Sequence, residues 1–224
     1  MADVPKDYDE QIRQLFKDAR LKYYPKNQII QYQGDKLSQV YLIVKGYVKN
    51  YTILDSGDTR TLFILGPNDV FPVVFTAGNN WHDYEIRYFY QSLTDVQLRV
   101  LTADDFMRII DEDKTKRQAY MSFVSAVNES MVDQLEAMKQ KSAIARIVYM
   151  LPYLMHKMGQ RVGPAAYQLK IKLTHQELAD ISGVTRETTT TLVKKLEKKG
   201  AIKQKQGRLV IYKKLLDKLR DNNH

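Results

Sequence analysis

Residues 173–200 read Leu173-Thr-His-Gln-Glu-Leu-Ala-Asp-Ile-Ser-Gly-Val-Thr-Arg-Glu-Thr-Thr-Thr-Thr-Leu-Val-Lys-Lys-Leu-Glu-Lys-Lys-Gly200. This pattern predicts two short helices joined by a turn. Thr174 and Glu177 lie three residues apart, as in the capping box that begins a helix. Gly183 permits a sharp turn, and Thr185 is a typical cap for a second helix that ends at Gly200. The stretch therefore predicts a helix-turn-helix, in which the N-terminal end of the second helix enters the major groove of DNA.

The first two residues of the predicted second helix, Arg186 and Glu187, have the chemistry to read base pairs. Arginine offers two donors to the O6 and N7 acceptors of guanine, and glutamate accepts from the N4 amino group of cytosine. The same side chains also fit an ordinary exposed first turn, where the helix dipole favours a glutamate. We predict base contacts by both residues, because a capped partner helix precedes them and a basic segment follows.

A second DNA-contacting element is predicted directly after this helix. Residues 201–205 and 208–212 are β-rich runs separated by Gln206-Gly207, a pair that favours a hairpin turn. The hairpin fits a wing beside the recognition helix, and it also fits a plain hairpin that closes a small core. The side chains that we predict to contact DNA phosphates are Thr174, His175, Thr185, Thr188 and Thr189 on the helices and Lys203, Lys205 and Arg208 on the hairpin.

The distribution of charge along the 224 residues separates two parts of the chain. Residues 1–138 contain 16 Lys and Arg against 20 Asp and Glu, a net charge of −4, whereas residues 139–224 contain 19 against 6, a net charge of +13. A basic module suits the phosphate backbone of nucleic acid, and the acidic part suits another task. A solvated basic face without a partner would have the same composition.

The part before residue 102 is rich in β-strand signals. Short β-rich runs end at turn residues, with glycines about ten residues apart, which is typical of an antiparallel β-roll. A short helix is predicted before these runs, around residues 10–19. The predicted strands are Gln28–Tyr32, Val40–Val44, Tyr47–Ile53, Arg60–Leu65, Tyr84–Tyr90 and Val96–Leu101.

A long helix is predicted between about Thr115 and Gln140. Its apolar residues recur every three or four positions and form one narrow stripe, which suits a seam between two helices. The stripe fits either a second copy of the same helix or the β-roll of the same chain. Ser142 can cap a further helix, so we divide the chain into a β-roll domain (1–114), a dimerisation helix and hinge (115–141) and a winged-helix domain (142–224). The stripe consists of Tyr120, Val124, Val127, Met131, Leu135 and Met138.

Composition excludes several kinds of chemistry. The chain has no cysteine, which excludes disulfides, thiolate nucleophiles, Cys-ligated zinc and Cys-held iron–sulfur clusters. Its four histidines are too far apart in sequence to suggest a metal pair. No apolar run approaches eighteen residues and no apolar block follows the polar start, so we expect a cytoplasmic protein without a membrane span or signal peptide.

Five stretches together resemble the Crp-Fnr superfamily of bacterial transcription regulators: Tyr32–Asp35, Val40–Gly46, Leu65–Asp69, Leu173–Ala179 and Val184–Thr188. The resemblance covers nearly the whole chain. It implies an α+β fold with an N-terminal cyclic-nucleotide-binding-like β-roll, a long dimerisation helix and a C-terminal winged helix-turn-helix. It further implies a homodimer that binds a near-palindromic site on double-stranded DNA and acts with RNA polymerase. It favours the dimer seam for the apolar stripe, with Val124, Val127, Met131, Leu135 and Met138 as seam residues.

The sequence departs from this family at two places. Members often carry a second arginine five residues after the first, where this chain has Thr191. One base contact is therefore lost or replaced, and Thr191 is the residue that we predict to replace it. Cyclic-nucleotide binders carry a Gly-Glu turn and a downstream Arg-Ser or Arg-Thr, and residues 70–90 contain neither. The resemblance therefore does not imply that cyclic AMP binds in the usual way. Glu85 and Arg87 fit a surface ion pair on one face of a strand.

Aromatic residues fill the segment where the cyclic nucleotide would bind. Such a cluster fits an apolar effector pocket, and it also fits core packing in the strands. His82 is a possible haem ligand by analogy with relatives, although a lone histidine between Trp81 and Asp83 fits an ordinary loop better, so we expect no cofactor. The predicted pocket residues are Phe71, Phe75, Trp81, Tyr84, Arg87, Tyr88, Tyr120 and Val124.

The function that these observations favour is a sequence-specific DNA-binding regulator, not an enzyme, controlled by a small-molecule effector other than cyclic AMP. One alternative is a regulator that works without an effector and keeps a vestigial β-roll. A metalloenzyme with a β-barrel needs clustered His and Glu, and the β-roll offers one histidine. A non-specific architectural or RNA-binding protein would fit the basic charge but would not use Arg186 for base readout.

Overall fold

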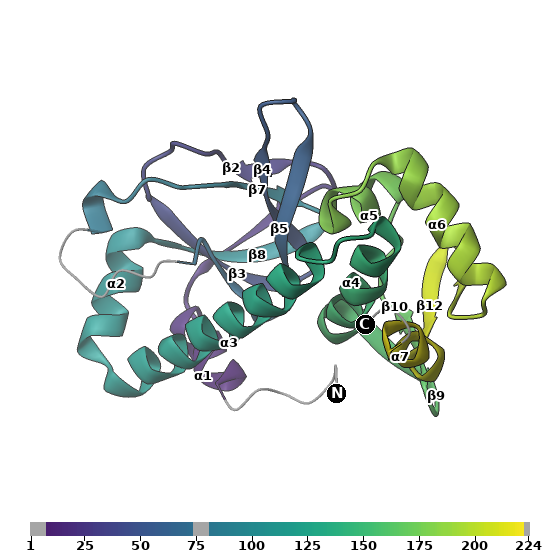
Figure 1. The fold of residues 1–224 in the computed structure, drawn as a ribbon. Coiled ribbons are helices and arrows are strands. Elements are labelled where there is room, and N and C mark those ends of the chain that lie inside the picture. The colour runs from purple at the N-terminus through teal and green to yellow at the C-terminus, as the bar shows by residue number, and fades with distance from the viewer. Residues whose placement is uncertain (1–7, 74–80, 222–224) are drawn as a thin grey trace. The chain divides into compact units, whose positions relative to one another are not determined.

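The computed structural model describes residues 8–73 and 81–221, which form an α+β protein (Figure 1). Contacts between residues divide the chain into two units. One unit combines the described residues before Ile53 with Leu62–Glu129, and the other combines Ile53–Thr61 with the residues from Ser130 onward. The predicted order of β-roll, long helix and helix-turn-helix is confirmed.

The β-roll consists of two four-stranded sheets, which are built from antiparallel strand pairs. The first sheet has the order β1 (Arg20–Tyr24), β8 (Val96–Thr102), β3 (Gln39–Lys45) and β6 (Val70–Phe71). The second has the order β2 (Ile29–Gln31), β7 (Phe89–Ser92), β4 (Val48–Ile53) and β5 (Thr59–Leu65).

The centre of the first sheet is the apolar core of the β-roll. Four successive residues of β3, Val40 to Ile43, are buried, because elements cover both faces of this strand. The turn after β3 requires glycine at position 46. Its φ is +90°, and a Cβ there would collide with the backbone oxygen of Asp95. Only a residue without a side chain fits this close approach.

Three helices flank the β-roll in the sequence: α1 (Asp9–Leu15), α2 (Ala103–Glu112) and the long α3 (Lys114–Met138), which continues past Glu129 into the other unit. A cap fixes the start of α2, since the Thr102 side chain accepts a hydrogen bond from the backbone N–H of Asp105. Phe106 of α2 is fully buried between Phe16 and Tyr120, with ring centroids 5.8 Å and 5.1 Å away. Aromatic contacts therefore join the three helices.

The apolar stripe on α3 is divided between two environments. Tyr120, Val124 and Val127 are buried within the chain, whereas Leu135 is 55% exposed and Met138 is 37% exposed. The prediction that Val124 and Val127 face a second copy is therefore wrong.

The buried face of α3 continues instead through Gln134, which is 4% exposed and donates from Nε2 to the backbone oxygen of Thr61 at 3.2 Å. The hydropathy pattern instead predicted Leu135, the next residue, as a member of the apolar stripe. Neighbouring helix positions differ by about 100°, so that step moves Leu135 off the buried face.

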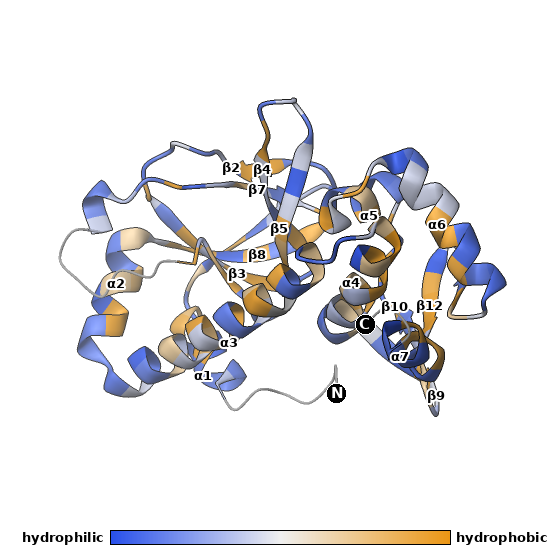
Figure 2. Cartoon of the chain, viewed as in Figure 1, coloured by the Kyte–Doolittle hydropathy of each residue, from blue (hydrophilic) through white to orange (hydrophobic). Residues whose placement is uncertain are grey.

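In the other unit, α3 is followed by α4 (Ala143–Met158), which passes through Pro152. Ser142 caps this helix as predicted and accepts from the backbone N–H of Ala145 at 3.2 Å. Most of α4 is hydrophobic in Figure 2, and nine of its residues are buried. It is therefore the central core element of this part.

Helices and a small sheet surround α4. The helices are α5 (His175–Ser182), α6 (Arg186–Lys198) and α7 (Lys213–Asp221). The sheet has the order β11 (Ile202–Lys205), β12 (Arg208–Tyr212), β10 (Ala166–Leu169) and β9 (Gly159–Gly163). The hairpin of β9 and β10 was not predicted, because its sequence lacks the alternation typical of strands.

The strand predictions were wrong at one place and missed β1 and β6. Residues 84–88 are not a strand, since β7 begins at Phe89 and Trp81–Asp83 form a short 3-10 helix. The strand β1 precedes the first predicted strand.

None of the helices in the described ranges is both long enough and apolar enough to span a membrane.

Candidate nucleic-acid interface and effector pocket

The first helix of the helix-turn-helix begins with a complete capping box. The Thr174 hydroxyl accepts from the backbone N–H of Glu177 at 3.1 Å, and the Glu177 carboxylate accepts from the backbone N–H of Thr174 at 2.6 Å. Two backbone donors that lack helical partners are thereby satisfied. The predicted start of α5 is confirmed.

The turn between α5 and α6 has the predicted glycine in a left-handed conformation. Gly183 ends α5 with a φ of +69°. Thr185 caps α6 and accepts from the backbone N–H of Thr188 at 3.3 Å, while its own hydroxyl donates to Thr188 Oγ1 at 2.9 Å. The apolar residues of α5 and α6 that are buried in the core are Leu178, Ala179, Ile181, Val193 and Leu196.

The three predicted base-contacting residues are exposed on α6. Arg186 and Glu187 occupy its first turn, and neither side chain has a hydrogen bond or ion pair with any described residue. Thr191 lies one turn further, where its hydroxyl donates to the backbone oxygen of Glu187 at 3.1 Å. A free guanidinium and a free carboxylate therefore stand side by side at the end of α6 that enters a major groove in helix-turn-helix proteins.

The predicted phosphate-contacting residues on the helices differ in exposure. Thr174, Thr185 and Thr188 are exposed and His175 is half-buried. Thr189 is fully buried, and its hydroxyl has no hydrogen-bond partner in the described part of the chain. The prediction that Thr189 contacts a phosphate is therefore wrong, because this side chain points into the core between the helices.

The wing has the predicted hairpin geometry. β11 and β12 pair so that Lys205 lies opposite Arg208, and both turn residues, Gln206 and Gly207, have positive φ, at 52° and 74°. Two positive φ values are typical of the type I′ turn. The hairpin both closes the core, with Leu209 buried, and exposes its cations. The exposed cations are Lys203, Lys205 and Arg208.

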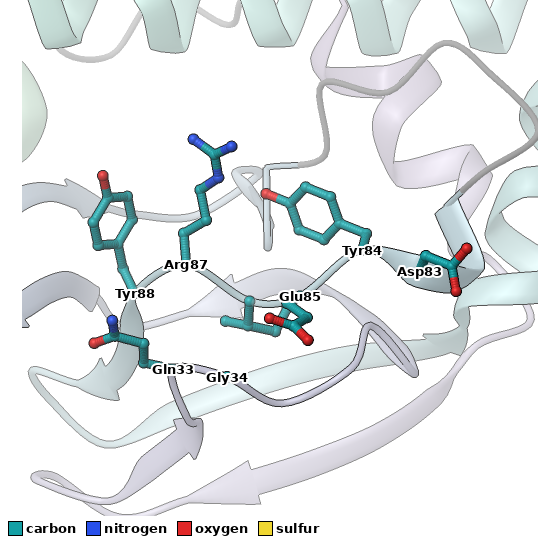
Figure 3. Close-up of a pocket in the computed structure, with 8 residues that line it drawn as sticks. Gln33, Gly34, Asp83, Tyr84, Glu85, Arg87 and Tyr88 are labelled. Carbon is teal, nitrogen blue, oxygen red and sulfur yellow. The ribbon is translucent and has the colours of Figure 1, made fainter.

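A cavity of about 620 Å³ opens in the β-roll (Figure 3). The side chains of Tyr84, Arg87 and Tyr88 rise on one side of their segment, while Glu85 points to the other. Burial raises the pKa of Tyr84, and the nearby Arg87 cation opposes this shift. The lining residues are Gln33, Gly34 and residues 83–88.

Two family models match the chain. The model described as "Cyclic nucleotide-binding domain" matches residues 21–113, and that described as "Crp-like helix-turn-helix domain" matches residues 142–221. The chain belongs to the Crp-Fnr family. It is a DNA-binding transcription regulator and not an enzyme.

Similar proteins cover most of this Crp-Fnr chain. The global nitrogen regulator of Synechococcus elongatus is 25% identical over 194 residues, 86% of each chain. The transcriptional regulator ArcR of Staphylococcus haemolyticus is 27% identical over 203 residues, 88% of this chain and 86% of ArcR. The structure of FixK2 from Bradyrhizobium japonicum has a TM-score of 0.75 at 18% identity and covers 90% of this chain and 96% of FixK2.

Three of the predicted effector-pocket residues, Tyr84, Arg87 and Tyr88, line the cavity of this Crp-Fnr regulator. Phe71 is fully buried in the core, where it stacks between Tyr41 and Tyr90 at centroid distances of 4.9 Å and 5.2 Å. Three further predicted residues are outside the cavity lining: Tyr120 and Val124, which are buried on α3, and Trp81, whose ring lies against His82 at 3.7 Å. Phe75 lies outside the described residues.

The expected ion pair between Glu85 and Arg87 is absent from the described structure. The two side chains point to opposite sides of an irregular segment (Figure 3). The backbone of Glu85 forms an isolated β-bridge with that of Lys36. The prediction assumed a strand, in which residues two apart share a face.

Lys172 is a further cation in the DNA-binding domain of this Crp-Fnr regulator that was not predicted from the sequence. Its exposed side chain lies against Gly207 at the tip of the wing, so it adds a cation to those of β11 and β12. The only sequence signal was its position after the buried Ile171. Residues far apart in the sequence therefore build the basic surface of the wing.

Proposed function

We propose that this regulator acts as a homodimer on a near-palindromic DNA site, with α6 of each copy in a major groove. The observation that carries the proposal is the pair Arg186 and Glu187, exposed and without side-chain partners among the described residues. Their donors and acceptor match guanine and cytosine edges. Two copies related by a two-fold axis would place their half-sites about 34–36 Å apart, one turn of the duplex.

Apolar side chains on the exposed face of α3 support self-association. Val132 is 56% exposed, Leu135 55% and Met121 50%. Met121, Val132 and Leu135, with the polar Asn128 between them, fall on positions of a seven-residue repeat, which keeps side chains on one seam between two helices. A second copy of α3 is the occupant that we propose, because an isologous interface pairs one apolar face with itself.

Selection of bound duplexes from a random pool tests the DNA proposal. We expect recovery of a two-fold symmetric site. The variant Arg186→Ala should lose about 1–3 kcal/mol of binding free energy at that site and little at altered sites.

Lys203→Ala is the matched control for this selection. It should weaken binding to all duplexes alike, because a phosphate contact carries no sequence information. It should also reduce the slope of log affinity against log salt concentration by about 1. Asymmetric or scattered sequences, or a uniform loss for Arg186→Ala, would contradict specific readout by a dimer.

We also propose that the cavity of the β-roll takes a small organic anion as effector, rather than cyclic AMP or a haem. Arg87 supplies one positive charge beside the hydroxyl groups of Tyr84 and Tyr88. A volume of about 620 Å³ lies within the usual range for small-molecule sites. The ring faces of the two tyrosines suit a flat body, and the guanidinium suits a carboxylate or phosphate.

Thermal unfolding with cyclic AMP and a panel of small organic acids tests this proposal. A ligand present at one hundred times its dissociation constant should add about 2.7 kcal/mol to the free energy of unfolding. Arg87→Gln should abolish the stabilisation, whereas Arg108→Gln, at an exposed residue of α2, should retain it. Stabilisation by cyclic AMP alone, or by no compound, would contradict the proposal, and the latter would favour a regulator without an effector.

A further inference from the structure

A hydrogen bond connects the two helices of the helix-turn-helix near the predicted DNA surface. Thr190 Oγ1 lies 2.9 Å from His175 Nδ1. His175 is the first residue of α5, and Thr190 lies in the second turn of α6, one turn after Arg186. Both side chains are half-buried. The contact thus joins a predicted phosphate-contacting residue to the helix that carries the base-reading pair.

The hydrogen-bond partners of Thr190 determine which atom donates. Its Oγ1 also lies 2.9 Å from the backbone oxygen of Arg186. A carbonyl oxygen only accepts, so the single hydroxyl hydrogen of Thr190 goes to Arg186. The contact with His175 must then use a lone pair of Oγ1, with Nδ1–H of the imidazole as donor. In the neutral ring this leaves Nε2 without a hydrogen.

We propose that Thr190 is a positioning residue, which fixes the His175 imidazole through Nδ1 so that Nε2 binds a DNA phosphate beside the bases read by α6. The inference rests on the proposed insertion of α6 into the groove. Position and chemistry support it, because His175 begins a helix whose N-terminal N–H groups also favour an anion. Nδ1 is committed to Thr190, so Nε2 is the ring atom left for another partner.

This arrangement couples DNA binding to a proton. Phosphate oxygens accept hydrogen bonds, so Nε2 must carry a hydrogen to bind one, and a ring with hydrogens on both nitrogens is an imidazolium cation. Histidine is the side chain that ordinarily changes charge between pH 5 and 8. Each half-site therefore takes up a proton at His175 when the neutral ring binds. By linkage, a lower pH favours DNA binding.

Other charged groups lie on the elements packed against His175. The Glu177 carboxylate accepts from the backbone of Thr174, and that of Asp180 accepts from Gln176 Nε2 at 2.7 Å. The charged or titratable groups are Glu177 and Asp180 on α5, Arg186, Glu187, Lys194, Lys195, Glu197 and Lys198 on α6, and Arg146, Tyr149, Tyr153, His156 and Lys157 on α4. Variants of His175 itself therefore separate its contribution to any pH profile.

The test compares two adjacent threonines of α6. Thr190→Val removes the acceptor for Nδ1, whereas Thr189→Val makes the same change at a buried neighbour. Each dissociation constant is measured on the selected duplex and on one whose Arg186-contacting base pairs are replaced, at pH 6 and pH 8. We expect Thr190→Val to weaken both duplexes by the same factor, about three- to tenfold at pH 6, and by less at pH 8. Thr189→Val should match the unmodified chain, and Thr190→Ser should restore affinity.

A double-mutant cycle separates positioning from a general structural role. In the His175→Ala chain, Thr190→Val should change affinity by less than about twofold, because the group that it positions is gone. His175→Gln should flatten the pH dependence while thermal unfolding shows that each variant is folded. An equal loss with and without His175, failure of serine to restore affinity, or an unchanged pH profile in His175→Gln would overturn the inference. If the unmodified chain selects no DNA site, the proposed function fails instead.

Discussion

Arg146 donates a hydrogen bond from Nη1 to the backbone oxygen of Gly183, 2.8 Å away. Arg146 lies near the start of α4, and Gly183 ends α5 at the turn before α6. The contact therefore joins the central helix of the DNA-binding domain to the turn that sets the angle between α5 and α6.

The variant Arg146→Met should destabilise the chain. It keeps much of the aliphatic volume but removes the donor to the Gly183 carbonyl, so we expect the free energy of unfolding to fall by about 1–3 kcal/mol. Urea denaturation measures the change. Arg161→Met is the control, because it removes hydrogen bonds to the backbone oxygens of Gly163 and Pro164 at an exposed site, and it should change stability by less than about 0.5 kcal/mol. Equal effects of the two variants would contradict a special role for the Arg146 contact.

The left-handed conformation at the turn predicts intolerance of a side chain. Gly183→Ala should cost about 1–2 kcal/mol, since φ is +69° there and Cβ approaches the following carbonyl in that conformation. Gly163→Ala is a matched substitution, because a Cβ at Gly163 would meet only the Ala166 Cβ at an ordinary 3.5 Å. Thermal or urea unfolding should show little loss for this second variant, and an equal loss in both would argue against strain at Gly183.

The buried hydroxyl of Thr189 predicts a stabilising substitution. Thr189→Val replaces a buried group that lacks a hydrogen-bond partner in the described structure with a methyl group of similar size. We expect the free energy of unfolding to rise by about 1 kcal/mol, because an unsatisfied buried hydroxyl is unfavourable. Urea denaturation tests the gain. Loss of stability would show that the hydroxyl has a partner in solution.

The exposed apolar face of α3 predicts a sensitive dimer. Leu135→Asp should shift the chain toward monomers, because it would place charges opposite each other in the proposed seam. Light scattering coupled to size-exclusion chromatography measures the mass. Val162→Asp introduces the same charge at another apolar residue, 53% exposed on β9, and should leave the mass unchanged. A dimer that persists in Leu135→Asp would place the interface elsewhere.

Buried tyrosines predict a loss of stability at alkaline pH. Burial raises the pKa of Tyr90, and a hydrogen bond from the Val73 backbone opposes this only in part. The unfolded chain releases the Tyr90 proton near pH 10, whereas the folded chain keeps it. The unfolded state thus binds fewer protons above pH 10, so the free energy of unfolding falls as the pH rises further.

Urea denaturation between pH 9 and pH 11.5 measures this decline. Tyr90→Phe should make it shallower, because the substituted ring has no proton to release. Tyr23→Phe changes a tyrosine that is 67% exposed and should leave the slope as it is. Equal slopes in all three chains would show that Tyr90 does not link folding to alkaline pH.

Local signals made the helix-turn-helix predictable. Caps such as Thr174, Ser142 and Thr185 act on backbone groups within three residues of themselves, and the φ of Gly183 follows from its lack of a side chain. These interactions do not depend on what packs against the helices. The predicted starts of the helices were therefore confirmed.

The face of a helix that is buried was not predictable in the same way. Gln134 is buried on α3 because the backbone oxygen of Thr61 accepts from its side chain, while the more apolar Leu135 stays exposed. The lining of the effector pocket was not predictable from the sequence either. Phe71 and Tyr84 both fitted an aromatic cluster, but only the register of the surrounding strands places one in the core and the other at the cavity.

The four consecutive threonines of α6 show what the sequence determined and what the tertiary structure determined. Their sequence, with the cap at Thr185 and the pair Arg186 and Glu187, was enough to predict an exposed recognition helix, because capping and base-reading chemistry are local. Only the tertiary structure distinguishes the four identical side chains. Successive helix residues point about 100° apart, so the packing of α6 on α5 leaves Thr188 and Thr191 exposed, buries Thr189 and places Thr190 against His175.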